Sequence, residues 1–495
     1  MIALHQKSLF HASWIVSLAV ATALAASRAD AAELIAIGTL TDSTDLSGLT
    51  GTLENGDPAN ILGGIGSGLA YAGGDTFLAL PDRGPNAVAF TGGDAYDNTT
   101  SYVARFQTVT MTLAPTLSGS LPYSLTPTLD STTLLYSTTP LDYGTAPVPT
   151  ANTGNQYFFT GRSDAFGPGS SLVTTDARLD PESVRVSNDG RSVFISDEYG
   201  PYVYEFDRAT GARIQTFNLP AEYGIANKSA VGDTEISTNA TGRVSNKGME
   251  GLAISPDGKT LVGFMQSPLA QDGGDGGRYN RIVTIDIATG ATHQYVYDNY
   301  IGTDPTNGDS LNKTYNSSEI VAINDHEFLV LERDGKGLGD GSSAKVKKVY
   351  KIDLAGATEL PPGTAGADNL AGYAVTKTQY LDLRSALQSL GFTPQQIPAK
   401  LEGMAFGQDV VVNGVTKHTL YVANDNDFVP DQCAASVALG TVCDSDNFYV
   451  FAFDSTDLPD YQAQEVAPVP LPAAGWLLVS GLGALGAAVR RRRNS

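Results

Sequence analysis

Residues 250–266 read EGLAISPDGKTLVGFMQ, and this stretch decides the fold. Two short apolar runs, 251–255 and 261–266, flank the turn Pro256-Asp257-Gly258. Glycine supplies the positive φ that tight hairpin turns need. The pattern therefore predicts two antiparallel strands joined by a tight turn, and Asn188-Asp189-Gly190 marks a second copy.

The hairpin belongs to a longer repeat. First strands open on Glu182, Glu250, Glu319 and Glu402, which lie 68, 69 and 83 residues apart, and a further copy at 66–71 opens without an acid. Third strands end in aspartate, and Ala-Thr-Gly turns at 209–211 and 288–290 lead to a fourth strand. Four short strands in a repeat of this length are typical of a propeller blade.

The predicted fold class is an all-β β-propeller with a C-terminal hydrophobic helix. Dividing about 430 residues by a repeat of about 70 predicts six blades, and five or seven also fit the spacing. Residues 85–180 are poorly patterned, so we expect them to hold an irregular blade and insertions. One helix is predicted near 383–390, where Gly391 and then Pro394 end it.

Both termini carry targeting patterns. Lys7, an apolar core at 14–26 and the small-residue site Ala29-Asp30-Ala31 predict a signal peptide over residues 1–32. Val469-Pro470-Leu471-Pro472 precedes an uncharged segment, 473–489, and then four arginines, 490–493. Seventeen uncharged residues are just enough to span a bilayer, and the arginines would hold their C-terminal end in the cytoplasm.

This order of motifs resembles the PEP-CTERM sorting signal of Gram-negative bacteria, with Leu471 where an acid is usual. The resemblance implies export across the inner membrane, recognition by an exosortase and removal of the tail, which leaves the protein at the cell surface or outside the cell. The alternative is a plain C-terminal anchor. We therefore expect a propeller domain over 33–455, a linker over 456–468 and a sorting signal over 469–495 with a transmembrane segment at 473–489.

The amino-acid composition limits the classes of molecule that the protein can bind. The net charge of −22 becomes about −27 once both terminal segments are removed. Such a surface repels phosphate backbones and excludes nucleic acid as a partner. Acidic Gly- and Asn-rich loops suit a cation-binding protein and a merely soluble extracellular protein equally well.

Few residues suit histidine or zinc chemistry. Only His293, His326 and His418 lie outside the signal peptide, so a three-histidine metal site or a histidine-based triad would need nearly all of them. Cys433 and Cys443, the only cysteines, are predicted to form a disulfide in an oxidising compartment.

Four glutamates are candidate metal ligands. The first strand of each blade lines the central tunnel, so Glu182, Glu250, Glu319 and Glu402 should face one another across one tunnel mouth. Gathered carboxylates need a cation or partial protonation, and oxygen-only ligands favour Ca²⁺. The alternatives are a solvated acidic rim and glutamates that bond backbone amides to align the blades.

Besides the four glutamates, a ring of charged side chains is expected at the ends of the second strands of the blades. Arg83 and Arg333 are placed to hold an anionic substrate group, because guanidinium binds phosphate or carboxylate in a fork. Asp197 and Glu198 are candidate general bases. The alternative is that each arginine pairs with neighbouring carboxylates to stabilise the tunnel.

Six motifs stand out along the chain: GLAY (68–71), FLALPDRGPN (77–86), DPESVRVSNDGRSVFISDEYG (180–200), NKGMEGLAISPDGKTLVG (246–263), FLVLERDG (328–335) and LEGMAFG (401–407). Taken as a set, they resemble the phytase-like esterase family. The resemblance implies a propeller that hydrolyses phosphoesters or esters, often with Ca²⁺. It places the D-P-E motif on Asp180 to Glu182 and E-G motifs on Glu250 and Glu402. Ser183 departs from the usual glycine, and the lysine-rich site of a true phytase is missing.

These observations predict an exported Ca²⁺-dependent hydrolase of phosphate or carboxylic esters that acts on a small molecule at the propeller tunnel. The rival hypothesis is a non-enzymatic matrix protein that binds extracellular polysaccharide and is presented through the exosortase system. Catalysis by the propeller would be lost on replacing Glu250 with glutamine, whereas a binding protein would show no turnover at all.

Overall fold

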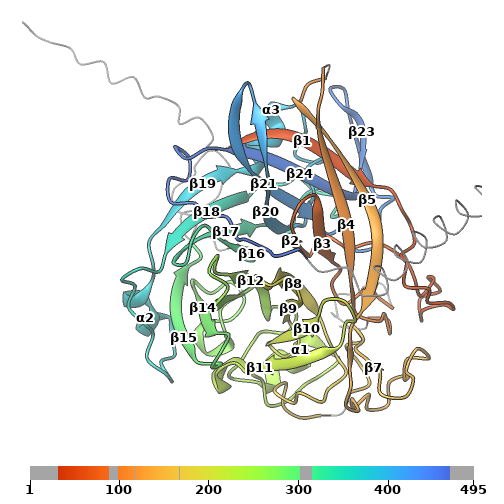
Figure 1. Cartoon of the computed structure of the whole chain (residues 1–495). Helices are drawn as coiled ribbons and strands as arrows, with labels where there is room; N and C mark the ends of the chain where they lie inside the picture. The colour runs from red at the N-terminus through yellow and green to blue at the C-terminus, as the bar shows by residue number, and fades with distance from the viewer. Residues whose placement is uncertain (1–31, 88–98, 118, 167, 301–314, 469–495) are drawn as a thin grey trace, which may run out of the picture.

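Five four-stranded antiparallel sheets stand around a central axis in this computed structural model (Figure 1). The structure describes residues 32–87, 99–117, 119–166, 168–300 and 315–468. The alternating runs of the repeat form these sheets. One strand from each sheet, β2, β8, β12, β16 and β20, lines the axis, and each contacts the next in a closed ring.

Each sheet is one blade, counted here in chain order. Blade 1 comprises β2 (Gly68–Tyr71), β3 (Thr76–Leu80), β4 (Arg105–Pro115) and β5 (Tyr123–Leu134). Blade 2 comprises β8 (Pro181–Val186), β9 (Ser192–Asp197), β10 (Tyr202–Asp207) and β11 (Arg213–Phe217). Blade 3 comprises β12 (Met249–Ile254), β13 (Thr260–Met265), β14 (Tyr279–Asp286) and β15 (Thr292–Asp298).

Blade 4 comprises β16 (Asn316–Ala322), β17 (Glu327–Arg333), β18 (Lys347–Asp353) and β19 (Lys377–Asp382). Blade 5 comprises β20 (Leu401–Val412), β21 (Val415–Asn424), β24 (Asp446–Phe453) and β1 (Glu33–Leu40). The outermost strand of blade 5 thus comes from the start of the described chain. Pairing of β1 with β24 joins the two ends of the domain and closes the ring.

The prediction of an all-β propeller is confirmed, but six blades are not: the described residues form five. The count went wrong because two long connections add length without adding a blade. Residues 81–104 separate β3 from β4, and the described part of residues 135–180 contains only the short pair β6 (Tyr136–Ser137) and β7 (Tyr157–Phe158). In addition, β1 completes an existing blade.

Glycines let the inner strands approach one another closely. A Cβ added to Gly251 would lie 3.0 Å from the backbone nitrogen of Ile320 on the next inner strand. A Cβ on Gly403 would lie 2.8 Å from the carbonyl oxygen of Gly66. The glycine of the E-G motif therefore serves blade packing, while apolar clusters between adjacent blades form the core.

The remaining elements are short. The helices are α1 (Gly232–Thr238), α2 (Ala367–Leu370) and α3 (Leu383–Ser389), and the 3₁₀ turns are η1 (Ala221–Tyr223), η2 (Ala270–Asp272) and η4 (Ala371–Tyr373). The predicted helix near 383–390 is confirmed as α3, and the Asp382 carboxylate caps it by accepting from the Ser385 N–H at 2.9 Å. The predicted disulfide joins Cys433 and Cys443 across β22 (Cys433–Ser436) and β23 (Gly440–Cys443).

The segment after β24 runs across one end of the tunnel. We call residues 454–467 the strap. Its backbone N–H groups at Gln462 and Ala467 donate to the carbonyls of Ile323 and Asn188, each at 2.8 Å, and Tyr461 packs on Phe406 with ring centres 4.6 Å apart. The strap contains nearly all of the expected linker, residues 456–468, and its contacts lie on several blades.

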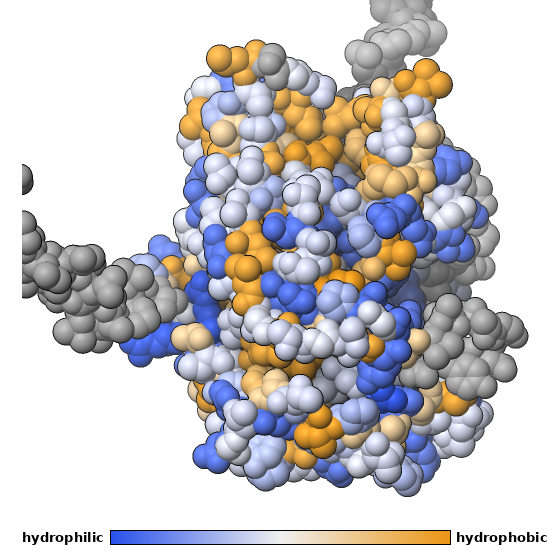
Figure 2. Space-filling model, turned by 90° about the vertical axis from the view of Figure 1, so that its right-hand side faces the viewer, coloured by the Kyte–Doolittle hydropathy of each residue, from blue (hydrophilic) through white to orange (hydrophobic). Residues whose placement is uncertain are grey.

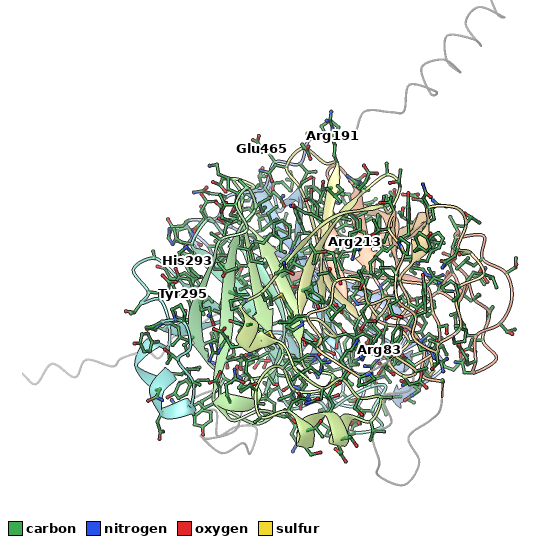
Figure 3. All side chains as sticks on the ribbon, turned by 90° about the horizontal axis from the view of Figure 1, so that it is seen from below. Arg83, Arg191, Arg213, His293, Tyr295 and Glu465 are labelled. Atoms are coloured by element: carbon green, nitrogen blue, oxygen red, sulfur yellow. A yellow bond between two sulfur atoms is a disulfide. The ribbon has the colours of Figure 1, made fainter. Side chains whose placement is uncertain are left out.

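The strap and the candidate site occupy opposite ends of the molecule. Figure 3 shows Glu465 of the strap at one end and Arg83 at the other. Figure 2 shows hydrophilic and hydrophobic residues intermixed on one side of the propeller. Apolar residues gather near the top of that view, toward which the long β4–β5 hairpin extends in Figure 1.

The predicted signal peptide and sorting signal fall on residues 1–31 and 469–495, apart from Ala32, and so lie outside the described residues, as does the predicted C-terminal hydrophobic helix. None of the helices in the described part of the chain has the length and apolar character needed to cross a bilayer.

Candidate functional site

An acidic cavity of about 750 Å³ opens at the end of the tunnel where the inner strands begin. Seven acidic side chains line it against four basic ones, Arg83, Lys247, Arg333 and Lys400. The acidic residues are Asp57, Asp82, Glu182, Glu198, Glu250, Glu402 and Asp427. The cavity therefore carries an excess of negative charge, and most of its charged side chains are shielded from water.

A shared irregularity of the inner strands places three of the predicted glutamates at this mouth. The register with the second strand shifts at the start of β8, β12 and β20, next to Glu182, Glu250 and Glu402. Such bulges re-aim a side chain. The three glutamates are 8%, 3% and 2% exposed, so the structure brings them together at one buried rim.

Glu319 lies elsewhere, and its expected equivalence to the other three is wrong. Gly251 pairs with Phe264 and Glu319 pairs with Leu331, so Glu319 matches Gly251, and Ser318 matches Glu250. Glu319 does not line the acidic cavity. Its carboxylate is 2.8 Å from the Arg185 guanidinium and accepts from Ser183 Oγ at 3.0 Å. It therefore ties inner strands together, as the alternative interpretation expected.

One group of carboxylates at the mouth has the arrangement of a cation site. Asp180, Glu182 and Glu198 each offer an oxygen, and these atoms all lie within 4.8 Å of one another. Burial, and then the charges of Glu250 and Asp180, raise the pKa values of Glu182 and Glu198 well above their usual range. The group thus has to take up protons or a cation.

The donor set fits Ca²⁺. All the available ligand atoms are carboxylate oxygens, which hard cations prefer. Glu250, beside this group, has a buried Oε2 that accepts no hydrogen bond. Burial, and then the charge of Glu402, raise the pKa of Glu250 to about 8. A buried oxygen without a partner is costly, so the site is electrostatically incomplete without a further proton or ion.

A second group, Asp82, Asp425 and Asp427, has oxygens within the same 4.8 Å. Here the chain supplies its own cation, because Lys400 Nζ forms a close ion pair with Asp425 and lies 2.7 Å from Asp427. Burial opposes the charge on Lys400, but the aspartates outweigh it and raise its pKa well above the usual value.

The two candidate arginines both reach the cavity and both have acidic partners. Arg333 forms a close ion pair with Glu402 and lies 3.8 Å from Glu250. Arg83 lies 3.4 Å from Asp180 and also donates to the Asn246 side chain. The geometry places positive charge at the mouth while satisfying the alternative expectation of arginine–carboxylate pairs.

The two candidate bases differ. Glu198 lines the cavity, and its Oε1 accepts from the Gly248 N–H at 3.1 Å. Asp197 lies behind it, and its carboxylate accepts from the N–H groups of Asp180, Tyr199 and Gly200. Asp197 therefore shapes the turn that carries Glu198 and does not line the cavity.

Sequence reasoning assigned no role to Lys247 or Lys400. Each lies just before an inner-strand glutamate, Lys247 three residues before Glu250 and Lys400 two before Glu402. A lysine that precedes the E-G motif was a usable signal, because it enters the same tunnel mouth as the acid. Asp180 was assigned no ligand role either, although it belongs to the D-P-E motif.

Comparison with known proteins identifies relatives of this propeller. The family described as "Phytase-like: Esterase-like activity of phytase" matches residues 60–428. A protein of Arthroderma benhamiae called "Uncharacterized secreted protein" is 38% identical over 192 residues, which cover 34% of this chain and 37% of that relative. The chain thus matches little more than a third of the relative's length.

Solved structures show weaker likeness. The periplasmic gluconolactonase of Pseudomonas aeruginosa is 13% identical with a TM-score of 0.29, and the match covers 86% of this chain and 99% of that one. Hydrazine synthase of Kuenenia stuttgartiensis is 12% identical with a TM-score of 0.27, over 74% and 78% of the two chains.

Proposed function

The chain belongs to the phytase-like family, and on that premise we propose that it is a Ca²⁺-dependent hydrolase of phosphate or carboxylic esters that acts at the acidic cavity. The observation that carries the proposal is the excess of carboxylates, seven against four cations, around one polar cavity. Repulsion between these carboxylates destabilises a protein whose cavity has only a structural role. A bound cation would be attracted by the same carboxylates and would remove the repulsion.

Asp180, Glu182 and Glu198 are the residues that would hold the ion, because their oxygens converge. When bound, Ca²⁺ would withdraw charge from an ester oxygen and lower the pKa of a nearby water. This assignment gives Glu198 a ligand role in place of the expected role as base. It omits Glu319 and Asp197.

Glu250 is the proton carrier in this proposal. Burial and the charge of Glu402 raise its pKa, which favours the protonated form that would donate a proton to the leaving alcohol. Arg333 and Arg83 face the same cavity and would hold the anionic end of the substrate. Because both arginines already pair with carboxylates, they can share charge with one or two anionic groups and suit a small ester better than a polyanion such as phytate.

We further propose that the protein is exported. The signal-like and sorting-like termini support this, as does the word "secreted" in the name of the fungal relative. Processing by an exosortase, with transient or retained membrane anchoring, stays part of the proposal.

The test separates the two roles of the cavity. Calcium content is measured on the purified protein by elemental analysis, and hydrolysis is measured with nitrophenyl phosphate and nitrophenyl acetate in Ca²⁺ or EDTA. We expect Glu182→Gln to lose both ion and activity, and Glu250→Gln to lose activity but keep the ion. Glu205→Gln, on the outer part of blade 2, is the matched control and should keep both.

A protein that binds Ca²⁺ but turns over neither ester would favour the rival hypothesis of a polysaccharide-binding matrix protein. A protein that binds no Ca²⁺ and is indifferent to EDTA would refute the proposed metal dependence.

A further inference from the structure

The tunnel mouth carries two groups of three carboxylates, and only one of them has room for an added cation. In the first group, Asp180 lies 3.4 Å from the Arg83 guanidinium, while Glu182 and Glu198 appear in no ion pair among the described residues. In the second group, formed by Asp82, Asp425 and Asp427, Lys400 pairs with Asp425 and Asp427. The two groups share chemistry and spacing, but a lysine ammonium contacts two carboxylates of the second group, whereas an arginine meets only Asp180 of the first.

Lys400 occupies the position that an ion would take. Its Nζ contacts Asp425 closely, lies 2.7 Å from Asp427 and 3.9 Å from Glu402. The side chain comes from the residue just before β20, so the inner strand of blade 5 fixes its origin. A lysine ammonium is a compact point charge with three donors, which makes it a suitable replacement for a small cation among carboxylates.

The second group is also open to solvent ions. The Asp427 side chain is 56% exposed and that of Lys400 is 26% exposed. Access therefore does not prevent an ion from entering. The positive charge of Lys400 prevents a divalent ion from binding here, because the ion would lie close to the ammonium group.

We propose that Lys400 is a built-in substitute for a second metal ion, so that the mouth takes one divalent cation per chain, at Asp180, Glu182 and Glu198. The inference rests on the proposed function, since it assumes that the first group binds Ca²⁺. It adds the stoichiometry and names the residue that sets it. It also places one exchangeable positive charge, the bound ion, beside the fixed charges of the cavity's own basic side chains.

The experiment counts bound ions. Protein stripped with EDTA and dialysed is titrated with Ca²⁺ by isothermal calorimetry, and circular dichroism checks that each variant is folded. We expect one ion in the wild type and two in Lys400→Met. The double variant Lys400→Met/Asp427→Asn should return to one, because the new site then lacks a carboxylate. Lys336→Met, which removes an exposed lysine paired with Asp340, is the matched control and should bind one.

The outcomes separate the inference from the proposed function. One ion in the wild type and one in a folded Lys400→Met would overturn the inference and leave the proposed function intact. Two ions in the wild type would also overturn it. A wild type that binds none would refute the cation site itself and the inference with it. Should Lys400→Met fold only when Ca²⁺ is present, the ions bound to the folded variant are counted by elemental analysis: two would support the inference and one would overturn it.

Discussion

The buried pair of Arg185 and Glu319 gives the sharpest test of how the tunnel is built. Glu319→Gln keeps the shape of the side chain and removes its charge. The carboxylate is 2.8 Å from Arg185 and accepts from the Ile320 N–H at 2.9 Å and from Ser183 at 3.0 Å. Both members of the pair are buried, at 6% and 0% exposed.

The expected cost is large because the arginine stays behind. Breaking a buried ion pair by removing one partner typically costs about 3–5 kcal/mol. Three carbonyl oxygens, on Leu69, Val184 and Ile320, still accept from Arg185, which favours the lower end of that range. The double variant Arg185→Met/Glu319→Gln removes the orphaned charge, so its cost should fall short of the sum of the two single variants by at least about 1 kcal/mol.

The assay is urea unfolding followed by circular dichroism, in Ca²⁺ and in EDTA. The loss of stability in Glu319→Gln should be equal in both buffers, and its Ca²⁺ affinity should match the wild type. Glu205→Gln should change stability by no more than about 0.5 kcal/mol. A Glu319→Gln protein of normal stability that no longer binds Ca²⁺ would refute this reasoning and restore Glu319 as a metal ligand.

Three further predictions address other parts of the fold. Burial raises the pKa of Asp446 to about 7 from 3.8, so the native state holds a proton that the unfolded chain has lost, and this residue's contribution to stability falls as pH rises from about 4 to 7. The shift corresponds to about 4 kcal/mol, and Asp446→Asn should flatten the pH dependence of the unfolding free energy accordingly. Tyr461→Ala should cost about 2–3 kcal/mol in urea unfolding by removing the strap's aromatic contact, whereas Glu465→Ala, exposed on the same segment, should be neutral. Reduction of the Cys433–Cys443 disulfide should cost no more than about 3 kcal/mol, measured with and without reductant, because the closed loop is short; a larger loss would show that the hairpin supports the whole propeller.

Much of this architecture could be predicted from local pattern. The turn Pro256-Asp257-Gly258 and its flanking runs predicted the hairpins, and the spacing of the first-strand acids predicted a propeller. The tunnel rim formed by Glu182, Glu250 and Glu402 followed from pseudo-symmetry alone. These features repeat, so each copy supported the others.

The features that the sequence did not predict are those in which a single residue or segment departs from the repeat. The bulge recurs in β16, but Glu319 stands one position later in it than the other three glutamates do. The sequence marks this only by a spacing of 69 in place of 68 and by Ile320 where the E-G motif has glycine. Lys400 carries the opposite charge to the residues it joins, so a search for gathered acids passes over it. The strap is polar and lacks strand pattern, and only the contacts of residues such as Gln464, whose amide donates to the Val186 carbonyl at 2.8 Å, reveal its place.

The inner strands show why packing and chemistry can share one motif. At the bulge, one residue points to the mouth and the next lies where neighbouring strands nearly touch. Glycine at the second position allows the close approach, as at Gly251 and Gly403, and leaves the preceding glutamate free to serve the cavity. Blade 4 reverses this order: Ser318 takes the mouth position, and Glu319 takes the packing position, where the ion pair with Arg185 and the hydrogen bonds from Ser183 and Ile320 make a carboxylate tolerable. An acid at the mouth therefore faces the acidic cavity, where we propose that a cation binds, whereas the same acid one residue later serves the scaffold.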